Sequence, residues 1–296
     1  MQVSCHPSLV WTEILSFIKG SYEALHTAEG HLSEQQYLEV GHKRAPSFSG
    51  DRSQVYRVYE LYHQYKRNHG LFDEADVVFN IYRRLGKMNY RPWEIHEIYV
   101  DETQDFTQSE LALLVSLSSD PNRMFLTGDT AQGIMRGISF RFKDLSSLFY
   151  FAKHESRNHK GKLHKKLINV PREVYQLTHN YRSHTGILSL ATSVLNILVE
   201  LFPESFDKLE RDQGMFEGPK PVLIETCSPK DLALLLTGSR RKTSHIEFGA
   251  HQAILVANEE SKDRLPEELR SGVVLTIYEA KGLEFDDILI YNFFTG

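Results

Sequence analysis

Two adjacent carboxylates, Asp101 and Glu102, are the residues of this 296-residue chain whose types and spacing best suit catalysis. They end a short run of β-branched and aromatic residues, Ile98-Tyr99-Val100, which favours a buried strand. In an open α/β sheet, ligands bind at the edge where the strands end. Two acids at that edge can divide one task, because one can hold Mg²⁺, directly or through water, while the other polarises an attacking water.

The residues that follow place this acidic pair on a turn between a strand and a helix. Thr107 and Glu110 have the spacing of a capping box, and an apolar helix is expected to follow over 111–117. Acids on such a turn resemble the Walker B element of P-loop nucleotide hydrolases. The alternative, a strand that ends in solvated acids, is common and stays open on these two residues alone.

A second polar turn follows the next predicted strand, at 124–127. It reads Gly128-Asp129-Thr130-Ala131-Gln132-Gly133, and its glycines allow the backbone to turn sharply. Gln132 is then expected to reach the same sheet edge as the two acids. In a nucleotide hydrolase, a glutamine in that position senses the terminal phosphate and orients water. The alternative is a plain polar turn.

Strands and helices are expected to alternate along most of the chain, which predicts parallel α/β sheets. Helices are expected at 9–18 ending at Gly20, 54–66, 73–85 ending at Gly86, 111–117 and 187–201. Further strands are expected at 174–177, 221–225, 253–257, 273–277 and 288–291, with a helix from Ser228 to Gly238. In the helix at 54–66, tyrosines form a wide face, for which packing against a neighbouring helix is favoured over stacking on nucleic-acid bases.

The composition is that of an ordinary globular protein, with 41% hydrophobic and 25% charged residues. The net charge of −5 does not indicate nucleic-acid binding, so any nucleic-acid site would have to be a local basic patch. The two cysteines, Cys5 and Cys227, favour a reducing and hence intracellular compartment, nuclear or cytoplasmic. No stretch is long and apolar enough to span a membrane. The basic run at 150–166 is expected to form a solvated loop or linker, with phosphate contact as the minority interpretation.

Four separated signals stand in a fixed order and together resemble superfamily 1 helicases of the UvrD/Rep type. They read YVDETQDF at 99–106, LTGDTAQGI at 126–134, LTHNYRSH at 177–184 and TIYEAKGLEF at 276–285. The fold that this resemblance implies is α/β. It is part of a P-loop NTPase (RecA-like) helicase core, with two parallel-sheet lobes and helical additions.

The resemblance also implies a division of the chain into four segments. Residues 1–94 would be the mainly helical N-terminal part of the first lobe, and 95–148 its core. Residues 149–170 would form the basic linker, and 171–296 a second lobe that is cut short. The implied partner is single-stranded nucleic acid, DNA rather than RNA, and no membrane.

Roles toward ATP and Mg²⁺ follow from the resemblance for six positions. Asp101 would bind Mg²⁺, Glu102 would activate water, Gln132 would contact the terminal phosphate, Arg182 would act as an arginine finger, and Gly282 and Glu284 would close on the nucleotide. ATP would bind between the lobes, and hydrolysis would be coupled to lobe closure and movement along a single strand.

The sequence also departs from the family pattern. No G-x-x-x-x-G-K-[ST] occurs, because Gly86-Lys87 is followed by Met88 and Gly161-Lys162 by Leu163. The expected reason is truncation: the chain would be a fragment of a larger multidomain protein that also lacks the sixth motif, and alone it would hydrolyse little ATP. Tyr278 stands where the family has a histidine, and Gln132 is not followed by the usual aromatic residues.

Two competing interpretations remain open from the sequence. One is a degenerate, non-enzymatic helicase fold that serves as a scaffold or interaction module. The other is an unrelated P-loop ATPase such as a signalling switch, against which the HNYRSH and AKGLEF stretches argue.

Overall fold

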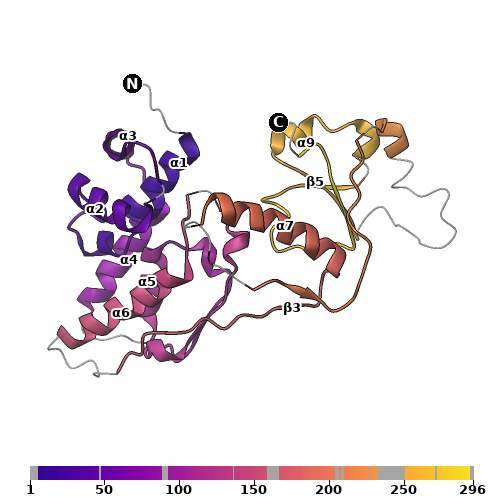
Figure 1. Ribbon diagram of the computed structural model, residues 1–296. Coiled ribbons are helices and arrows are strands. Elements are labelled where there is room, and N and C mark those ends of the chain that lie inside the picture. The colour runs from indigo at the N-terminus through magenta and orange to yellow at the C-terminus, as the bar shows by residue number, and fades with distance from the viewer. Residues whose placement is uncertain are drawn as a thin grey trace. The chain divides into compact units, whose positions relative to one another are not determined.

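The computed structural model describes residues 6–293 apart from 47, 89–92, 136, 159–166, 204–206, 208–209, 226, 233–250 and 271. The chain divides into two compact units, Met1–Lys220 and Pro221–Gly296 (Figure 1). The sequence places the start of a second lobe at residue 171 instead. That lobe boundary and the four-segment division stay a prediction.

The first unit begins with a group of six helices, four of which start at a side-chain cap. They are α1 (Pro7–Thr12), η1 (Glu13–Lys19), η2 (Glu23–His26), α2 (Glu34–Arg44), α3 (Arg52–His69) and α4 (Glu74–Lys87). Ser33 and Asp73 form capping boxes at α2 and α4, and Asp51 caps α3. Gly70 ends α3 in the left-handed conformation, with φ of 64°. The expected helix ending at Gly20 and the helix at 54–66 are therefore confirmed.

The tyrosine face of α3 packs inward. Val55, Tyr56 and Tyr59 are buried with Phe17 and Ile18 of η1 in the first hydrophobic core. Packing against a neighbouring element is thus confirmed for these tyrosines, because rings inside a core cannot stack on bases.

Helix α4 differs from its prediction in two details. Val77 and Ile81 were expected to point inward but are exposed, and Gly86 lies inside the helix, which ends only at Lys87. The buried face instead repeats every three or four residues along the side that meets α5. It consists of Ala75, Val78, Phe79 and Leu85.

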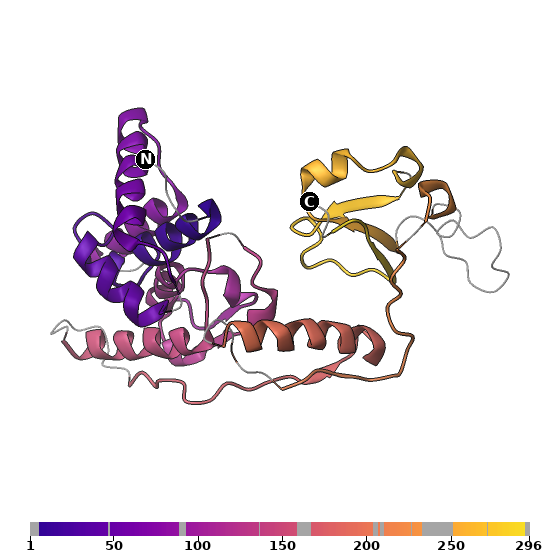
Figure 2. The same ribbon diagram turned by 45° about the horizontal axis from the view of Figure 1, so that its top comes forward.

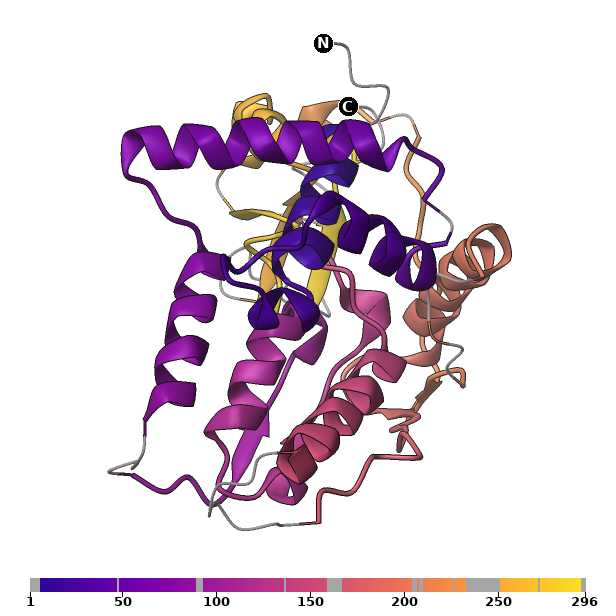
Figure 3. The same cartoon turned by 90° about the vertical axis from the view of Figure 1, so that its left-hand side faces the viewer.

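A small parallel sheet follows, flanked by helices. Strand β1 (Ile98–Val100) pairs with β2 (Met124–Leu126), and the chain between them carries η3 (Thr103–Asp105), α5 (Gln108–Leu117) and η4 (Pro121–Arg123). After β2 come η5 (Thr130–Gln132) and α6 (Phe142–Asn158). Figure 3 shows α4, α5 and α6 side by side, and their apolar residues form the second hydrophobic core.

In the remainder of the first unit, two predictions are wrong and one is confirmed. Residues 150–158 continue α6, so the expected loop is wrong there, while 159–166 lie outside the described residues. Residues 174–177 are not a strand; the pairing starts two residues later, between β3 (His179–Asn180) and β4 (Gln213–Gly214). Helix α7 (Thr185–Leu201) is confirmed.

The second unit holds a three-stranded parallel sheet in the order β6-β5-β7. Its elements are β5 (Gln252–Val256), α9 (Glu259–Asp263), η6 (Glu267–Leu269), β6 (Val273–Thr276) and β7 (Asp287–Ile290). Figure 2 shows these strands with α9 beside them. Three predicted strands are confirmed, whereas 221–225 is not a strand, and Gly238 lies outside the described residues.

Helices combined with small parallel sheets make the chain an α/β protein. The finer assignment to RecA-like lobes stays a prediction. Across the residues that the structure describes, none of the helices has both the length and the apolar character needed to cross a membrane.

Candidate functional site

Parallel pairing brings the two acidic and polar turns of the first unit to one sheet edge. Asp101 follows the last residue of β1, and Thr127 follows the last residue of the adjacent β2. The Thr127 N–H donates to the Val100 carbonyl at 2.8 Å, and the Thr103 N–H donates to the Thr127 carbonyl at 2.9 Å. The two turns are thus joined by backbone hydrogen bonds, as the sequence predicts for strands that end at the same edge.

Asp101 presents an ionised, accessible carboxylate at this edge. Its Oδ1 accepts a hydrogen bond from the Thr127 hydroxyl and another, at 2.9 Å, from the Glu102 N–H. These two hydrogen bonds, the one from Thr127 foremost, hold the pKa of Asp101 below its usual range. Asp101 therefore carries a negative charge at neutral pH and is exposed to solvent.

Glu102 is oriented by an uncommon backbone conformation and by a buried amide. Its φ of 53° and ψ of 42° lie in the left-handed region, which non-glycine residues seldom occupy outside functional turns. The side-chain amide of Gln104, itself only 2% exposed, donates to Glu102 Oε2. The direction of the Glu102 carboxylate is therefore fixed by its own chain within two residues.

Gln132 lies in the short helical turn η5 after β2, where it is exposed. Its side-chain amide donates to Asp129 Oδ2 at 3.0 Å. Asp129 in turn accepts from the Ala131 N–H at 2.9 Å, and its own N–H donates to Gln104 Oε1 at 2.9 Å. Gln132 is thus connected through Asp129 and Gln104 to Glu102.

Three residues that complete this network are absent from the set of candidates derived from the sequence. Gln104, Thr127 and Asp129 each touch a candidate residue and hold it in place. The sequence feature that could have identified them is that all three are polar and stand within four residues of a strand end. Such residues are positioning groups, and a sequence pattern alone does not reveal which of them turn inward.

Gly128 allows the two turns to approach closely. A Cβ at Gly128 would lie 2.4 Å from Thr103 Oγ1 and 2.6 Å from Gln104 Oε1, and both atoms already make hydrogen bonds. We expect Gly128→Ala to lower the free energy of unfolding by about 1–3 kcal/mol, as overpacking does. Urea denaturation of the chain measures it.

The matched control for this substitution is Gly133→Ala in the same loop. A Cβ at Gly133 would meet only the Thr130 carbonyl oxygen, at 3.4 Å, and its φ of −71° suits alanine. Its free energy of unfolding is expected to stay within about 0.5 kcal/mol of wild type. Equal effects of the two substitutions would contradict the close contact between the turns.

Arg182 lies in an exposed turn directly after β3. Asn180 shapes this turn, because its Oδ1 accepts from the Arg182 N–H at 3.0 Å and from the Ser183 N–H at 2.8 Å. His184 then caps α7, with its Nδ1 accepting from the Ile187 N–H. Asn180 and His184 of the third signal thus have local structural tasks, and the approach of Arg182 to Asp101 stays a prediction.

Gly282 and Glu284 belong to the second unit, in the connection between β6 and β7. Gly282 has a φ of 77°, which favours glycine, and Glu284 is exposed. The connection is braced at its start, where Glu279 Oε2 accepts from the Thr276 N–H at 2.9 Å and from Lys262 at 2.8 Å. These contacts fix the turn, and the approach of the two residues to a nucleotide stays a prediction.

The resemblance to helicases implies two ligands, ATP and Mg²⁺. The oxygen atoms at the β1–β2 edge fit the second of them. An exposed, ionised Asp101 with the Thr127 hydroxyl beside it offers the hard oxygen atoms that Mg²⁺ takes. A grip on the phosphates needs a glycine-rich loop with a lysine, and the sequence does not contain that pattern. The residues at this edge therefore suit Mg²⁺, but this chain does not contain the loop sequence that would bind the phosphates of ATP.

Comparison with known proteins places these residues in a helicase context. Residues 20–155 match the family model of the UvrD/REP helicase N-terminal domain. This range contains Asp101, Glu102 and Gln132 together with the residues that position them.

Individual proteins are also similar to this chain. The chain is 58% identical over 290 residues to TPR and ankyrin repeat-containing protein 1 of Homo sapiens, which covers 98% of this chain and 10% of that protein. It is 26% identical to a probable DNA helicase of Mycoplasma pneumoniae, over 81% of this chain and 45% of that protein. It is 25% identical to an ATP-dependent helicase/nuclease subunit of Streptococcus pneumoniae, over 88% of this chain and 20% of that protein.

The chain spans less than half of the length of each of these relatives. The high identity over nearly the whole chain nevertheless relates it to one segment of the human protein, and the distant helicases align over much of the same sequence. The chain is thus similar to a segment of TPR and ankyrin repeat-containing protein 1, and its residues 20–155 match the model of the UvrD/REP helicase N-terminal domain.

Proposed function

We propose that this chain is part of an ATP-dependent, UvrD-like helicase or translocase, in which ATP is bound and hydrolysed between two RecA-like lobes. The observation that carries the proposal is the joined pair of turns at the β1–β2 edge. There Asp101 and Glu102 lie against the Thr127–Gln132 segment through Thr127, Gln104 and Asp129. A strand that merely ended in solvated acids would not need a buried amide to direct one of them.

The two acids have different environments, and we assign them different tasks. Asp101, ionised and held by the Thr127 hydroxyl, binds Mg²⁺ directly or through water. The metal, when bound, neutralises charge on the phosphates. Glu102, oriented by Gln104, accepts a proton from the attacking water.

The other candidates complete the proposed site. Gln132 exchanges its hydrogen bond with Asp129 for a contact to the terminal phosphate, and Arg182 neutralises charge as the phosphoryl group transfers. Gly282 and Glu284 approach the nucleotide from the second lobe. The bracing of the β6–β7 connection by Glu279 supports the last assignment, because a fixed turn presents its residues in a constant direction.

The phosphate-gripping loop is assigned to sequence outside this chain. The 58% identity to a segment that makes up a tenth of a human protein supports a larger multidomain polypeptide. The proposed setting is intracellular, nuclear or cytoplasmic. Single-stranded nucleic acid is the proposed partner, DNA rather than RNA, since one relative is named as a probable DNA helicase.

The second candidate function is a degenerate helicase fold that binds partners without hydrolysing ATP. The specific observation in its favour is the missing G-x-x-x-x-G-K-[ST] sequence, because Gly86 and Gly161 each precede a lysine but not the required serine or threonine. The two candidates differ in whether nucleotide binds at all.

Nucleotide binding and hydrolysis by two proteins test the proposal. The 296-residue chain alone is expected to hydrolyse little or no ATP, since it lacks the lysine and amide donors of the phosphate loop. The longest natural polypeptide that contains it is expected to bind ATP with Mg²⁺ and to hydrolyse it faster with single-stranded DNA. Absence of nucleotide binding in both proteins favours the scaffold, and hydrolysis by the chain alone at about 1–100 s⁻¹ contradicts the assignment of the loop.

A further inference from the structure

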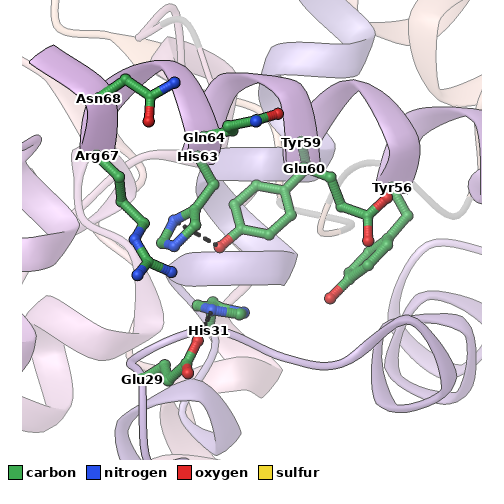
Figure 4. A pocket seen from close by; sticks show the side chains of 9 residues that line it. All are labelled: Glu29, His31, Tyr56, Tyr59, Glu60, His63, Gln64, Arg67 and Asn68. Carbon is green, nitrogen blue, oxygen red and sulfur yellow. Dashed lines mark hydrogen bonds and ion pairs between the residues drawn. The ribbon is translucent and has the colours of Figure 1, made fainter.

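A pocket of about 440 Å³ is lined by residues between 29 and 68 of the first unit, none of which belongs to the acidic turns (Figure 4). Glu29 and His31 reach it from the segment after η2, and His63 reaches it from α3. One ligating atom from each of these three side chains lies within 4.8 Å of the other two. Two imidazoles and a carboxylate are the ligands that zinc sites with an open position use.

We propose that Glu29, His31 and His63 form a binding site for a divalent transition-metal ion, with Zn²⁺ as the expected occupant and water at the remaining position. The ligands of a tetrahedral zinc site lie about 3.4 Å apart, given metal–ligand distances of about 2.1 Å. Atoms within 4.8 Å of one another reach that spacing by small side-chain rotations. The exposed Glu29 carboxylate has the freedom to make the larger part of this adjustment.

The backbone around Glu29 and His31 is fixed before any metal binds. Gly30 has a φ of 79°, and the Thr27 hydroxyl accepts from the N–H groups of Gly30 and His31 at 3.0 and 3.2 Å. A Cβ at Gly30 would collide with the Phe79 ring, at 2.6 Å. This turn therefore holds the two ligands on one side of the chain, which lowers the conformational entropy lost on binding.

In each of the two rings, Nδ1 contacts an oxygen atom that does not belong to the three proposed ligands. His31 Nδ1 lies 3.2 Å from the Leu32 carbonyl oxygen, and its Nε2 lies 3.0 Å from Glu29 Oε2. A neutral imidazole donates through only one nitrogen, so a cation between Nε2 and the carboxylate satisfies both acceptors. His63 Nδ1 meets the Tyr59 hydroxyl at 3.4 Å, an arrangement typical of metal-binding histidines oriented by a neighbour.

The competing explanation is an aromatic cluster without a metal. The ring centroids of His31, Tyr59 and His63 lie 5.0–5.7 Å apart, a spacing common for packed rings. Arg67 also lines the pocket and disfavours a cation, whereas Glu60 favours one. Stacking explains the contact of the rings, and a direct hydrogen bond or ion pair is the competing explanation for the Glu29 carboxylate at His31 Nε2.

Bound metal would connect the loop before α2 to α3. This consequence does not depend on nucleotide hydrolysis, because no residue of the site belongs to the β1–β2 turns. It can therefore be tested on the 296-residue chain alone, prepared without an affinity tag that binds metals.

Equilibrium dialysis against Zn²⁺, with the metal measured by mass spectrometry, is the test. One Zn²⁺ per chain is expected to bind wild type, and His31→Ala and His63→Ala are each expected to weaken that binding at least about tenfold. Glu29→Gln keeps an exposed side chain, cannot disturb the core, and is expected to weaken binding as well. Co²⁺ in place of Zn²⁺ should give the visible absorption of a tetrahedral site in wild type, and this absorption should be lost in His31→Ala and His63→Ala.

His69→Ala is the matched control, since His69 is exposed on the same helix, and its Nδ1 lies 2.8 Å from the Tyr65 carbonyl oxygen in its own turn. The chain has 14 histidines, so binding elsewhere has to be separated from binding at this site. Unchanged affinity in the His31→Ala and His63→Ala variants, or loss of binding in His69→Ala to the same degree, overturns the proposal. Failure of wild type to bind Zn²⁺ overturns it too.

Discussion

Replacing Glu102 with glutamine, in the longest natural polypeptide that contains this chain, is expected to lower ATP hydrolysis by about 10²–10⁴-fold. Glutamine keeps the shape of the side chain and can still contact the Gln104 amide, but it removes the group that takes a proton from water. Nucleotide binding should be retained, because the proposed metal ligand is Asp101. Steady-state hydrolysis and equilibrium binding of a fluorescent nucleotide measure the two effects separately.

Two further substitutions make this result specific. Asp101→Asn removes the charged ligand and is expected to weaken Mg²⁺-dependent nucleotide binding as well as hydrolysis. Glu97→Gln is the matched control, because Glu97 is an exposed carboxylate that precedes β1 and accepts from the Tyr99 hydroxyl. If wild type hydrolyses ATP and Glu102→Gln does so equally fast, the assignment of Glu102 is wrong.

The β1–β2 edge shows which parts of the candidate site can be predicted from sequence. The strand ends and the capping box at Thr107 are local properties, and both are confirmed. Parallel pairing then brings Asp101 and Thr127 together, since neighbouring parallel strands end at the same edge. The burial of Gln104 is not local: it depends on how the turn after β2 folds over the turn after β1.

The errors in secondary structure have a similar cause. Residues 174–177 and 221–225 have strand composition, but β-propensity becomes a strand only where a partner is available. Basic residues at 150–158 suggest a loop, yet Leu148 and Phe149 earlier in α6 are buried in the cores and carry the helix onward. In both cases, tertiary contacts and not the local sequence pattern determined the secondary structure.

Replacing Asp73 with asparagine is expected to lower the free energy of unfolding by about 3–5 kcal/mol, the usual effect of breaking a buried ion pair. Asp73 accepts from Lys19, Lys66 and the Tyr62 hydroxyl, the last at 2.7 Å. The side chains of Lys19 and Lys66 are only 2% and 6% exposed, and once the Asp73 charge is lost both buried ammonium groups share the single carboxylate of Asp76. Urea denaturation at neutral pH measures the effect.

Asparagine is the informative replacement, because Asp73 also caps α4 and asparagine caps a helix about as well as aspartate. The loss then reports the missing charge and not a missing cap. Asp51→Asn is the matched control: Asp51 caps α3 in the same way but is exposed. Its free energy of unfolding should stay within about 0.5 kcal/mol of wild type. Equal losses in both variants would contradict the role of the ion-pair network.

The same network predicts how stability depends on pH. Burial alone would raise the pKa of Asp73 and of Asp76, but hydrogen bonds from Lys19 and Lys66 outweigh burial and hold both pKa values below the usual range. A carboxyl whose pKa is lowered by folding contributes its full stabilisation above its unfolded pKa, about 3.9, and loses it as the pH falls toward the folded pKa. The free energy of unfolding of wild type should therefore decrease below about pH 5, and that of Asp73→Asn should decrease less steeply. Urea denaturation in steps from about pH 7 to pH 3 measures the two slopes, and parallel curves would show that Asp73 does not carry the acid sensitivity.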